Sequence, residues 1–246
     1  MIRHIRILGL SMLAVFAVGV VASASASAHT FVVCTEGGTE KYETNLCAKK
    51  KETGKFSFLP VEGTKTYTVE GKSSGVIKLE NNWGGLNEGT RTGLECKKSK
   101  FSGKIEKEGK SKEDVFTFQE CALYLVSGHR RIQPLCEVPN IITAKLKSAL
   151  ITGTGSGPED QLEPEVGGNI FTIEIRGCLA FEGQYELSGK QTCSLPEATV
   201  GLVEHEIVCS PPGSSLTFGY SPGTASAKLF MDTTVKLNGT AAWGAE

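Results

Sequence analysis

Residues 227–237 read AKLFMDTTVKL, and this stretch decides the fold class. Every second position carries a side chain suited to a buried face: Ala227, Leu229, Met231, Thr233, Val235 and Leu237. The positions between them are mostly charged or polar. A pleated strand turns successive side chains to opposite faces, so this period of two predicts a strand with one buried and one solvated face.

The same alternation recurs at residues 116–118, 144–150 and 171–176. No stretch of a dozen residues carries a helical apolar stripe with capping residues. The 29 glycines fall largely between the alternating runs, where turns need positive φ angles. We therefore predict an all-β fold, either an antiparallel β-sandwich or an irregular β-barrel, braced by disulfides.

Two segments carry more specific expectations. Residues 97–112 contain seven lysines and predict a hairpin that turns near Gly109 with a charged outer face, which discourages edge-to-edge aggregation. A patch for an anionic polymer is the alternative interpretation of these lysines. Residues 152–168 combine glycines, prolines and four acidic side chains, and they predict one long exposed loop.

Residues 1–28 have the pattern of a secretory signal peptide. Arg3 and Arg6 precede an apolar run over residues 7–22, and small residues follow up to an Ala-x-Ala site at 26–28. We expect residues 29–246 to form a single β-rich domain, with residues 29–85 as a candidate N-terminal subdomain. No later run reaches the roughly 18 apolar residues of a membrane span. The sequence therefore predicts a secreted protein, extracellular or associated with the cell envelope, with no transmembrane segment after cleavage.

All eight cysteines follow residue 28, so they would meet an oxidising compartment and form disulfides. They are Cys34, Cys47, Cys96, Cys121, Cys136, Cys178, Cys193 and Cys209. No Cys-x-x-Cys occurs, so the common zinc and thioredoxin spacings are absent. We expect neighbours to pair where strands turn back, as Cys34–Cys47, Cys121–Cys136 and Cys193–Cys209, with Cys96–Cys178 as a long-range bridge.

The charge balance argues against a nucleic-acid partner. The chain has 26 basic and 27 acidic side chains, and removal of the signal takes two arginines away. Dedicated nucleic-acid binders usually show a basic excess gathered on one face. The partner is otherwise unknown, with contact to a polysaccharide or the cell envelope as the expectation.

Catalytic signals are weak. Residues 219–223 read GYSPG and match the G-x-S-x-G nucleophile elbow, but that motif needs a histidine further along the chain. No histidine follows Ser221, so we interpret the segment as a turn between strands. The remaining histidines of the mature chain are His29, His129 and His205, and we expect the last two at the surface. We predict no catalytic residues and no cofactor.

One enzymatic alternative depends on His29. Cleavage after Ala28 would make it the N-terminal residue, and its α-amine and ring nitrogen could bind one copper ion. Secreted copper-dependent polysaccharide monooxygenases resemble this arrangement, with His129 or His205 as the second histidine. A third hypothesis is a carbohydrate-binding module that stacks sugars on Trp83 or Trp243.

Four segments in order carry a family resemblance: residues 94–98 (LECKK), 116–121 (FTFQEC), 135–137 (LCE) and 142–150 (ITAKLKSAL). This pattern resembles large paralogous sets of secreted, β-rich, cysteine-containing proteins of soil actinobacteria. The resemblance implies no activity, cofactor or catalytic residue. The leading functional hypothesis is therefore a secreted, non-catalytic extracellular or envelope-associated protein with a binding or adhesive role.

Overall fold

The computed structural model describes residues 29–73, 75–81, 90–127, 130–132, 138–152, 157–178, 182–195, 200–210, 214–220 and 223–246. These residues form sixteen strands and no helix, so the predicted all-β class is confirmed. The strands pair in antiparallel ladders. None of the described segments is a helix long and apolar enough to cross a membrane.

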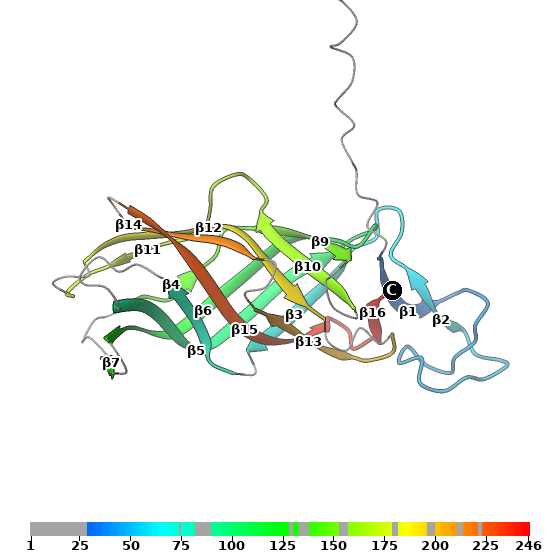
Figure 1. The fold of residues 1–246 in the computed structure, drawn as a ribbon. Helices are drawn as coiled ribbons and strands as arrows, with labels where there is room; N and C mark the ends of the chain where they lie inside the picture. The colour runs from blue at the N-terminus through cyan, green and yellow to red at the C-terminus, as the bar shows by residue number, and fades with distance from the viewer. Residues whose placement is uncertain are drawn as a thin grey trace, which may run out of the picture.

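Thirteen of these strands form a large sheet whose pairings close on themselves (Figure 1). We call the closed circuit the strand ring, and it corresponds to the irregular barrel of the two predicted architectures. In order around the circuit, its strands are β5 (Thr90–Ile105), β6 (Lys110–Ser127), β9 (Leu146–Thr152), β10 (Pro158–Pro164), β12 (Gly183–Ser194), β13 (Glu204–Cys209), β15 (Gly223–Leu237) and β3 (Tyr67–Ser73). The shorter strands that extend the sheet are β4 (Ile77–Asn81), β7 (Arg130–Ile132), β8 (Ile141–Ile142), β11 (Asn169–Ile175) and β14 (Ser215–Tyr220).

Apolar side chains from alternate strand positions fill the inside of the strand ring. On β15 all six alternating positions of residues 227–237 are buried, as the sequence predicts. Leu150, Leu187 and Val235 are each 1 % exposed or less. The period of two therefore separates the core from the solvated face in the way that the pleat requires.

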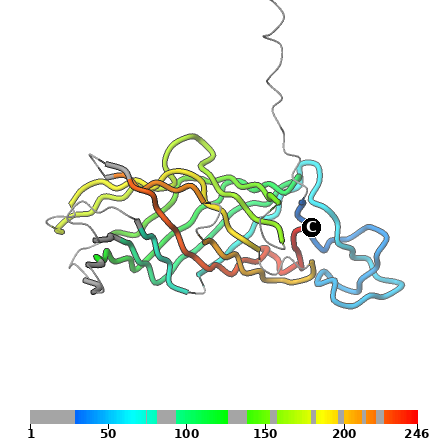
Figure 2. The backbone as a smooth tube through the Cα atoms, in the orientation of Figure 1, coloured from blue at the N-terminus to red at the C-terminus, as the bar shows by residue number. Residues whose placement is uncertain are grey.

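A second, three-stranded sheet covers one end of the strand ring, and we call it the cap. Its strands lie in the order β16 (Trp243–Ala245), β1 (Phe31–Glu36) and β2 (Phe56–Pro60). Thr30 and Glu246 exchange two backbone hydrogen bonds of 2.8 and 2.9 Å beside it. The segment between β1 and β2 projects away from the strand ring (Figures 1 and 2). The cap thus draws on both ends of the described chain, whereas β3 and β4, also within residues 29–85, pair in the large sheet.

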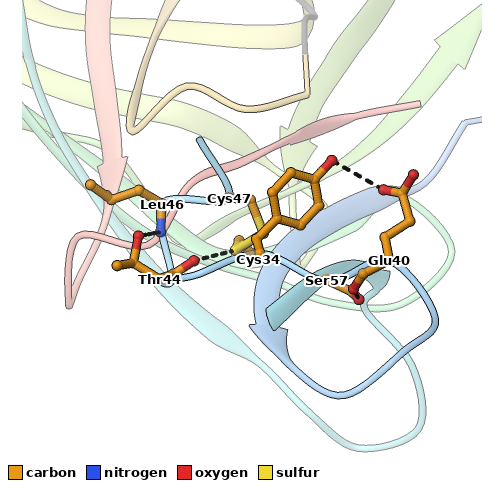
Figure 3. Close-up of a disulfide and its surroundings, with 7 residues drawn as sticks. Cys34, Glu40, Thr44, Leu46, Cys47 and Ser57 are labelled. Carbon is orange, nitrogen blue, oxygen red and sulfur yellow. Dashed lines mark hydrogen bonds between the residues drawn. A yellow bond between two sulfur atoms is a disulfide. The ribbon is translucent and has the colours of Figure 1, made fainter. Parts of the chain in front are cut away.

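A disulfide ties the projecting segment to the cap (Figure 3). Cys34 on β1 bonds to Cys47, and both are buried. The Leu46 N–H donates to Thr44 Oγ1 at 3.4 Å, and the Ser57 hydroxyl on β2 donates to the Glu40 carbonyl (Figure 3). These contacts hold an exposed, highly charged loop against a small sheet.

The disulfide map confirms two predicted pairs and corrects two. Cys34–Cys47 and Cys193–Cys209 form as expected. Cys96 bonds to Cys121, so the predicted Cys96–Cys178 and Cys121–Cys136 pairs are wrong. The reason is register, because Cys96 and Cys121 are direct partners across the β5–β6 ladder. Cys178 is also disulfide-bonded, and Cys136 lies outside the described residues.

Residues 97–112 form the predicted hairpin, with β5 and β6 turning back near Gly109. Several of its lysines face glutamates: Lys98 pairs with Glu120, Lys104 with Glu113, Lys110 with Glu108 and Lys112 with Glu106. Neighbouring carboxylates therefore neutralise much of this face, which favours a charged outer surface over an anion-binding patch. Solvent screens these exposed pairs, so they add little to stability.

Residues 152–168 do not form the single exposed loop that we expected. Residues 158–164 are β10, which pairs with β9 along its whole length and with β12. Asp160 and Leu162 alternate with Gln161 and Glu163, and the first two are buried. Pro158 and Pro164 stand at the two ends of the strand, where a missing N–H costs least. The turn-forming residues at its ends obscured this strand in the sequence.

Candidate functional site

A small cavity of about 20 Å³ lies between the cap and the strand ring, and we call it the cap cavity. Phe31 and Trp243 line it from the cap. The strand ring contributes apolar side chains and three polar ones, which are Ser111, Asp114 and Asp160. Asp114 is 1 % exposed and Asp160 is 8 % exposed. Two carboxyl groups inside an apolar core are unusual, because burial strongly disfavours an unpaired charge.

Irregularities in two ladders bring Ser111 and Asp114 to the same side of β6. Residues three apart in a regular strand point to opposite faces. The β6–β9 register shifts between these two residues, and the β5–β6 register shifts between Ser102 and Lys104. Such bulges redirect side chains. Both Ser111 and Asp114 are therefore buried.

The absence of a side chain at Gly103 leaves room for the Asp114 carboxyl group. A Cβ atom built on Gly103 would overlap Asp114 Oδ1 and lie 3.0 Å from the Phe101 ring. Gly103 lies opposite the β6 bulge, where one residue of β5 faces the two β6 residues Glu113 and Asp114. A glycine at this position is thus needed for the carboxyl to stay where it is.

We expect Gly103→Ala to lower the free energy of unfolding by about 1–3 kcal/mol, the usual cost of overpacking a core. Gly75→Ala is the matched control, because a Cβ there would meet nothing within 4 Å. Urea unfolding of both variants measures the difference. Equal midpoints for the two variants would contradict the role assigned to Gly103.

A chain of hydrogen bonds links the two carboxyl groups across three strands. The Ser111 hydroxyl on β6 bonds to Asp114 Oδ2 and lies 2.6 Å from the Ser148 hydroxyl on β9. Ser148 in turn bonds to Asp160 on β10. The order is Asp114, Ser111, Ser148 and Asp160. The other carboxyl oxygens, Asp114 Oδ1 and Asp160 Oδ1, are buried without a hydrogen-bond partner.

The number of protons available to this series of hydrogen bonds limits how many of the bonds can form at once. Its four groups make three hydrogen bonds, and each serine hydroxyl donates only one proton. If Ser111 donates to Asp114, Ser148 must donate to Ser111, and the bond to Asp160 then needs a proton from Asp160. The reverse direction of donation needs a proton from Asp114. With both carboxyls ionised, one of the three bonds is lost.

The pKa directions agree with this count. Burial is the main cause that raises the pKa of Asp114 to about 8, and the charges of Asp160 and Glu165 act in the same direction. Burial also raises the pKa of Asp160 to about 6, while its hydrogen bond with Ser148 lowers that pKa. Both carboxyls therefore bind protons far more tightly than exposed aspartates do.

The cap cavity is too small for catalysis on a sugar. Paired carboxyls perform acid–base chemistry on glycosides, but they need room for the substrate and an attacking water. A volume of about 20 Å³ holds a single water molecule. Within the described chain, no group of three or more His, Cys, Asp or Glu side chains comes together to hold a metal ion. The arrangement can store and release protons.

The structure does not bring His29 and His205 together. His205 is 2 % exposed, not at the surface as expected, because its strand position faces the core. Its Nε2 lies 3.0 Å from the Trp243 carbonyl. Trp243 pairs with Val33, and roughly 13 Å of extended chain separates Val33 from His29. The His29 Nδ1 atom is buried without a hydrogen-bond partner, and His129 lies outside the described residues.

Trp243 is not available as a sugar platform. Its side chain is 2 % exposed, its indole N–H donates to the Val203 carbonyl at 3.2 Å, and its ring contacts the ring of His205. The carbohydrate hypothesis is wrong for this residue. Trp83 and Ser221 lie outside the described residues. The elements on either side of residues 221–222 are β14 and β15, two antiparallel strands that pair with each other rather than a strand and a helix.

Asp114 and Asp160 were missed as site residues. One signal was present, since the chain has three aspartates and 24 glutamates, and the longer side chain usually carries exposed charge. The alternation of residues 158–164 was a second signal. Compared with protein-family models, curated proteins and solved structures, the chain matched none of them.

Proposed function

We propose that this chain is exported through a signal peptide at residues 1–28 and works outside the cytoplasm as a non-catalytic binding or structural protein. The disulfides are the observation that carries the proposal. Three are described, Cys178 forms a further bond, and none of the cysteines in the described part of the chain is free. Disulfides on this scale are typical of proteins that mature in an oxidising environment.

The non-catalytic part of the proposal is supported by the packing. The one cluster of buried, proton-binding side chains described here is enclosed by the strand ring and the cap, in a cavity that admits a water and no larger substrate. For the surface it contacts, we propose the cell envelope or a polysaccharide, in line with the resemblance to secreted actinobacterial proteins. The projecting segment offers charged, exposed side chains for such contact, among them Lys49 at 81 % and Lys50 at 67 %.

The test is the intact mass of the protein recovered from culture medium and washed cell envelopes, before and after reduction and with Cu²⁺ added. We expect a chain that begins at His29, a mass lower by two hydrogens for each disulfide, and no retained copper. A chain that keeps residues 1–28 and reduced thiols in the cytoplasm would refute export. A copper ion that the wild type retains and His29→Ala loses would replace the non-catalytic proposal with the copper enzyme.

A further inference from the structure

The carboxyl pair lies at the joint between the cap and the strand ring. The two sheets share no strand, so the cap is held to the ring by side-chain packing and a few backbone bonds. Phe31 and Trp243 of the cap line the same cavity as Asp114 and Asp160. Trp243 also exchanges backbone hydrogen bonds with Gly201 and Leu202, of 3.3 and 2.9 Å. A negative charge on either carboxyl group would therefore act directly on the packing between the cap and the strand ring.

The described surroundings of the pair supply no inward-facing cation other than a histidine. His205 on β13 faces the core and is bound to the Trp243 carbonyl. Glu165 accepts a hydrogen bond from the Glu113 N–H near Asp114 and adds negative charge. The other charged side chains on these strands that lie nearest the cavity in sequence are exposed or half-buried, among them Glu70, Lys104, Lys112, Glu113, Lys147, Glu159, Glu163, Glu204, Glu206, Asp232 and Lys236.

We infer that Asp114 and Asp160 form a proton-dependent lock that seats the cap on the strand ring. With a proton on at least one carboxyl, the chain through Ser111 and Ser148 keeps all three hydrogen bonds. With both carboxyls ionised, one bond fails and two like charges share an apolar cavity. Water must then enter to solvate them, and the cavity has room for one molecule.

The joint between the two sheets is where that water enters. Opening the strand ring would break a backbone ladder, and at the short β12–β13 ladder a disulfide as well. Lifting the cap edge breaks side-chain packing, the two backbone hydrogen bonds of Trp243, and its hydrogen bonds with His205 and Val203. The cap is therefore held firmly on the strand ring at acidic pH and less firmly at alkaline pH. The lock does not depend on the proposed function, because it follows from the fold of the chain alone.

The test is hydrogen–deuterium exchange of the disulfide-bonded chain between about pH 5 and about pH 9, corrected for the intrinsic pH dependence of amide exchange. The amides of Trp243 and Gly201 are hydrogen-bonded across this joint, to the carbonyls of Leu202 and Trp243. Because each unit of raised pKa changes the opening equilibrium about tenfold once the group ionises, we expect these amides to lose at least roughly tenfold protection in alkali. Amides in the β11–β12 ladder, which is remote from the cap, should keep their protection against exchange over the same pH range.

Variants of the two aspartates test whether their carboxyl groups cause the loss of cap protection at alkaline pH. Asp114→Asn/Asp160→Asn should keep cap protection constant over the same range, because amide N–H groups supply the missing proton at every pH. Asp232→Asn is the matched control, since Asp232 is exposed on β15, and it should behave as the wild type. If the double variant does not fold, each single variant should lose part of the pH dependence, because one amide completes the three bonds while the remaining carboxyl still ionises. Cap protection in the wild type that does not depend on pH would overturn the lock. The same loss of protection in the double Asn variant, or an equal loss in the β11–β12 ladder, would also overturn it.

Discussion

Raising the pH from about 5 to about 9 is expected to lower the free energy of unfolding by on the order of 5 kcal/mol. The folded-state pKa values of Asp114 and Asp160 are raised, to about 8 and about 6, from 3.8 for an ordinary aspartate. Raised carboxyl pKa values stabilise the fold while the groups are protonated. That stability begins to decline above the unfolded pKa near 4 and is lost as the pH passes through 6 and then 8.

Urea unfolding at about pH 5, 7 and 9 measures this dependence. The Asp114→Asn/Asp160→Asn variant should lose most of the difference and should be more stable than the wild type at pH 9. A wild type whose unfolding midpoint rises toward alkaline pH would show that the sign is wrong.

Trp243→Ala is expected to lower the free energy of unfolding by about 3–5 kcal/mol, the usual cost of removing a buried aromatic side chain. Trp243 is 2 % exposed and contacts the rings of Phe31, at a centroid distance of 6.1 Å, and of His205, at 4.5 Å. Its loss would enlarge the cap cavity and leave the Val203 carbonyl without its donor. The cap would then lose one of the apolar side chains that pack it into the core of the strand ring.

The matched control is Trp243→Phe, which keeps an aromatic ring and removes the indole N–H. We expect it to cost about 1–3 kcal/mol, from the unpaired carbonyl and a smaller packing defect. Urea unfolding of both variants at about pH 5, where the carboxyl pair is protonated, separates packing from charge. If Trp243→Ala were no more costly than Trp243→Phe, packing by this ring would not be what holds the cap.

Local sequence patterns predicted the strands and hairpins whose formation depends on residues close together in the sequence. The alternation of residues 227–237 is β15, and the lysine-rich segment is the β5–β6 hairpin. Cys34–Cys47 and Cys193–Cys209 could be predicted because short loops bring those residues together. Cys96–Cys121 could not, since its sequence separation of 25 spans a whole hairpin whose register the sequence leaves open.

Burial of polar residues was harder to predict than strand positions. The prolines and glycines around Asp160 predict a loop, yet pairing on both sides of β10 places this residue in the core. No local pattern relates His205 to Trp243, and the structure packs one against the other across a sequence separation of 38. A residue type sets only a preference for the surface, and the strands packed around it decide the outcome.

The sequence alone determined the all-β class, because the period-two alternation is a property of consecutive residues and the pleat turns it directly into two faces. The tertiary structure decided the site. Ser111 and Asp114 share a face only because ladder bulges shift their register, and Gly103 on another strand leaves room for the carboxyl. Asp160 joins them through Ser148 only because β9 lies between β6 and β10. Proton binding by the pair depends on distances between strands far apart in the chain, which no local pattern encodes.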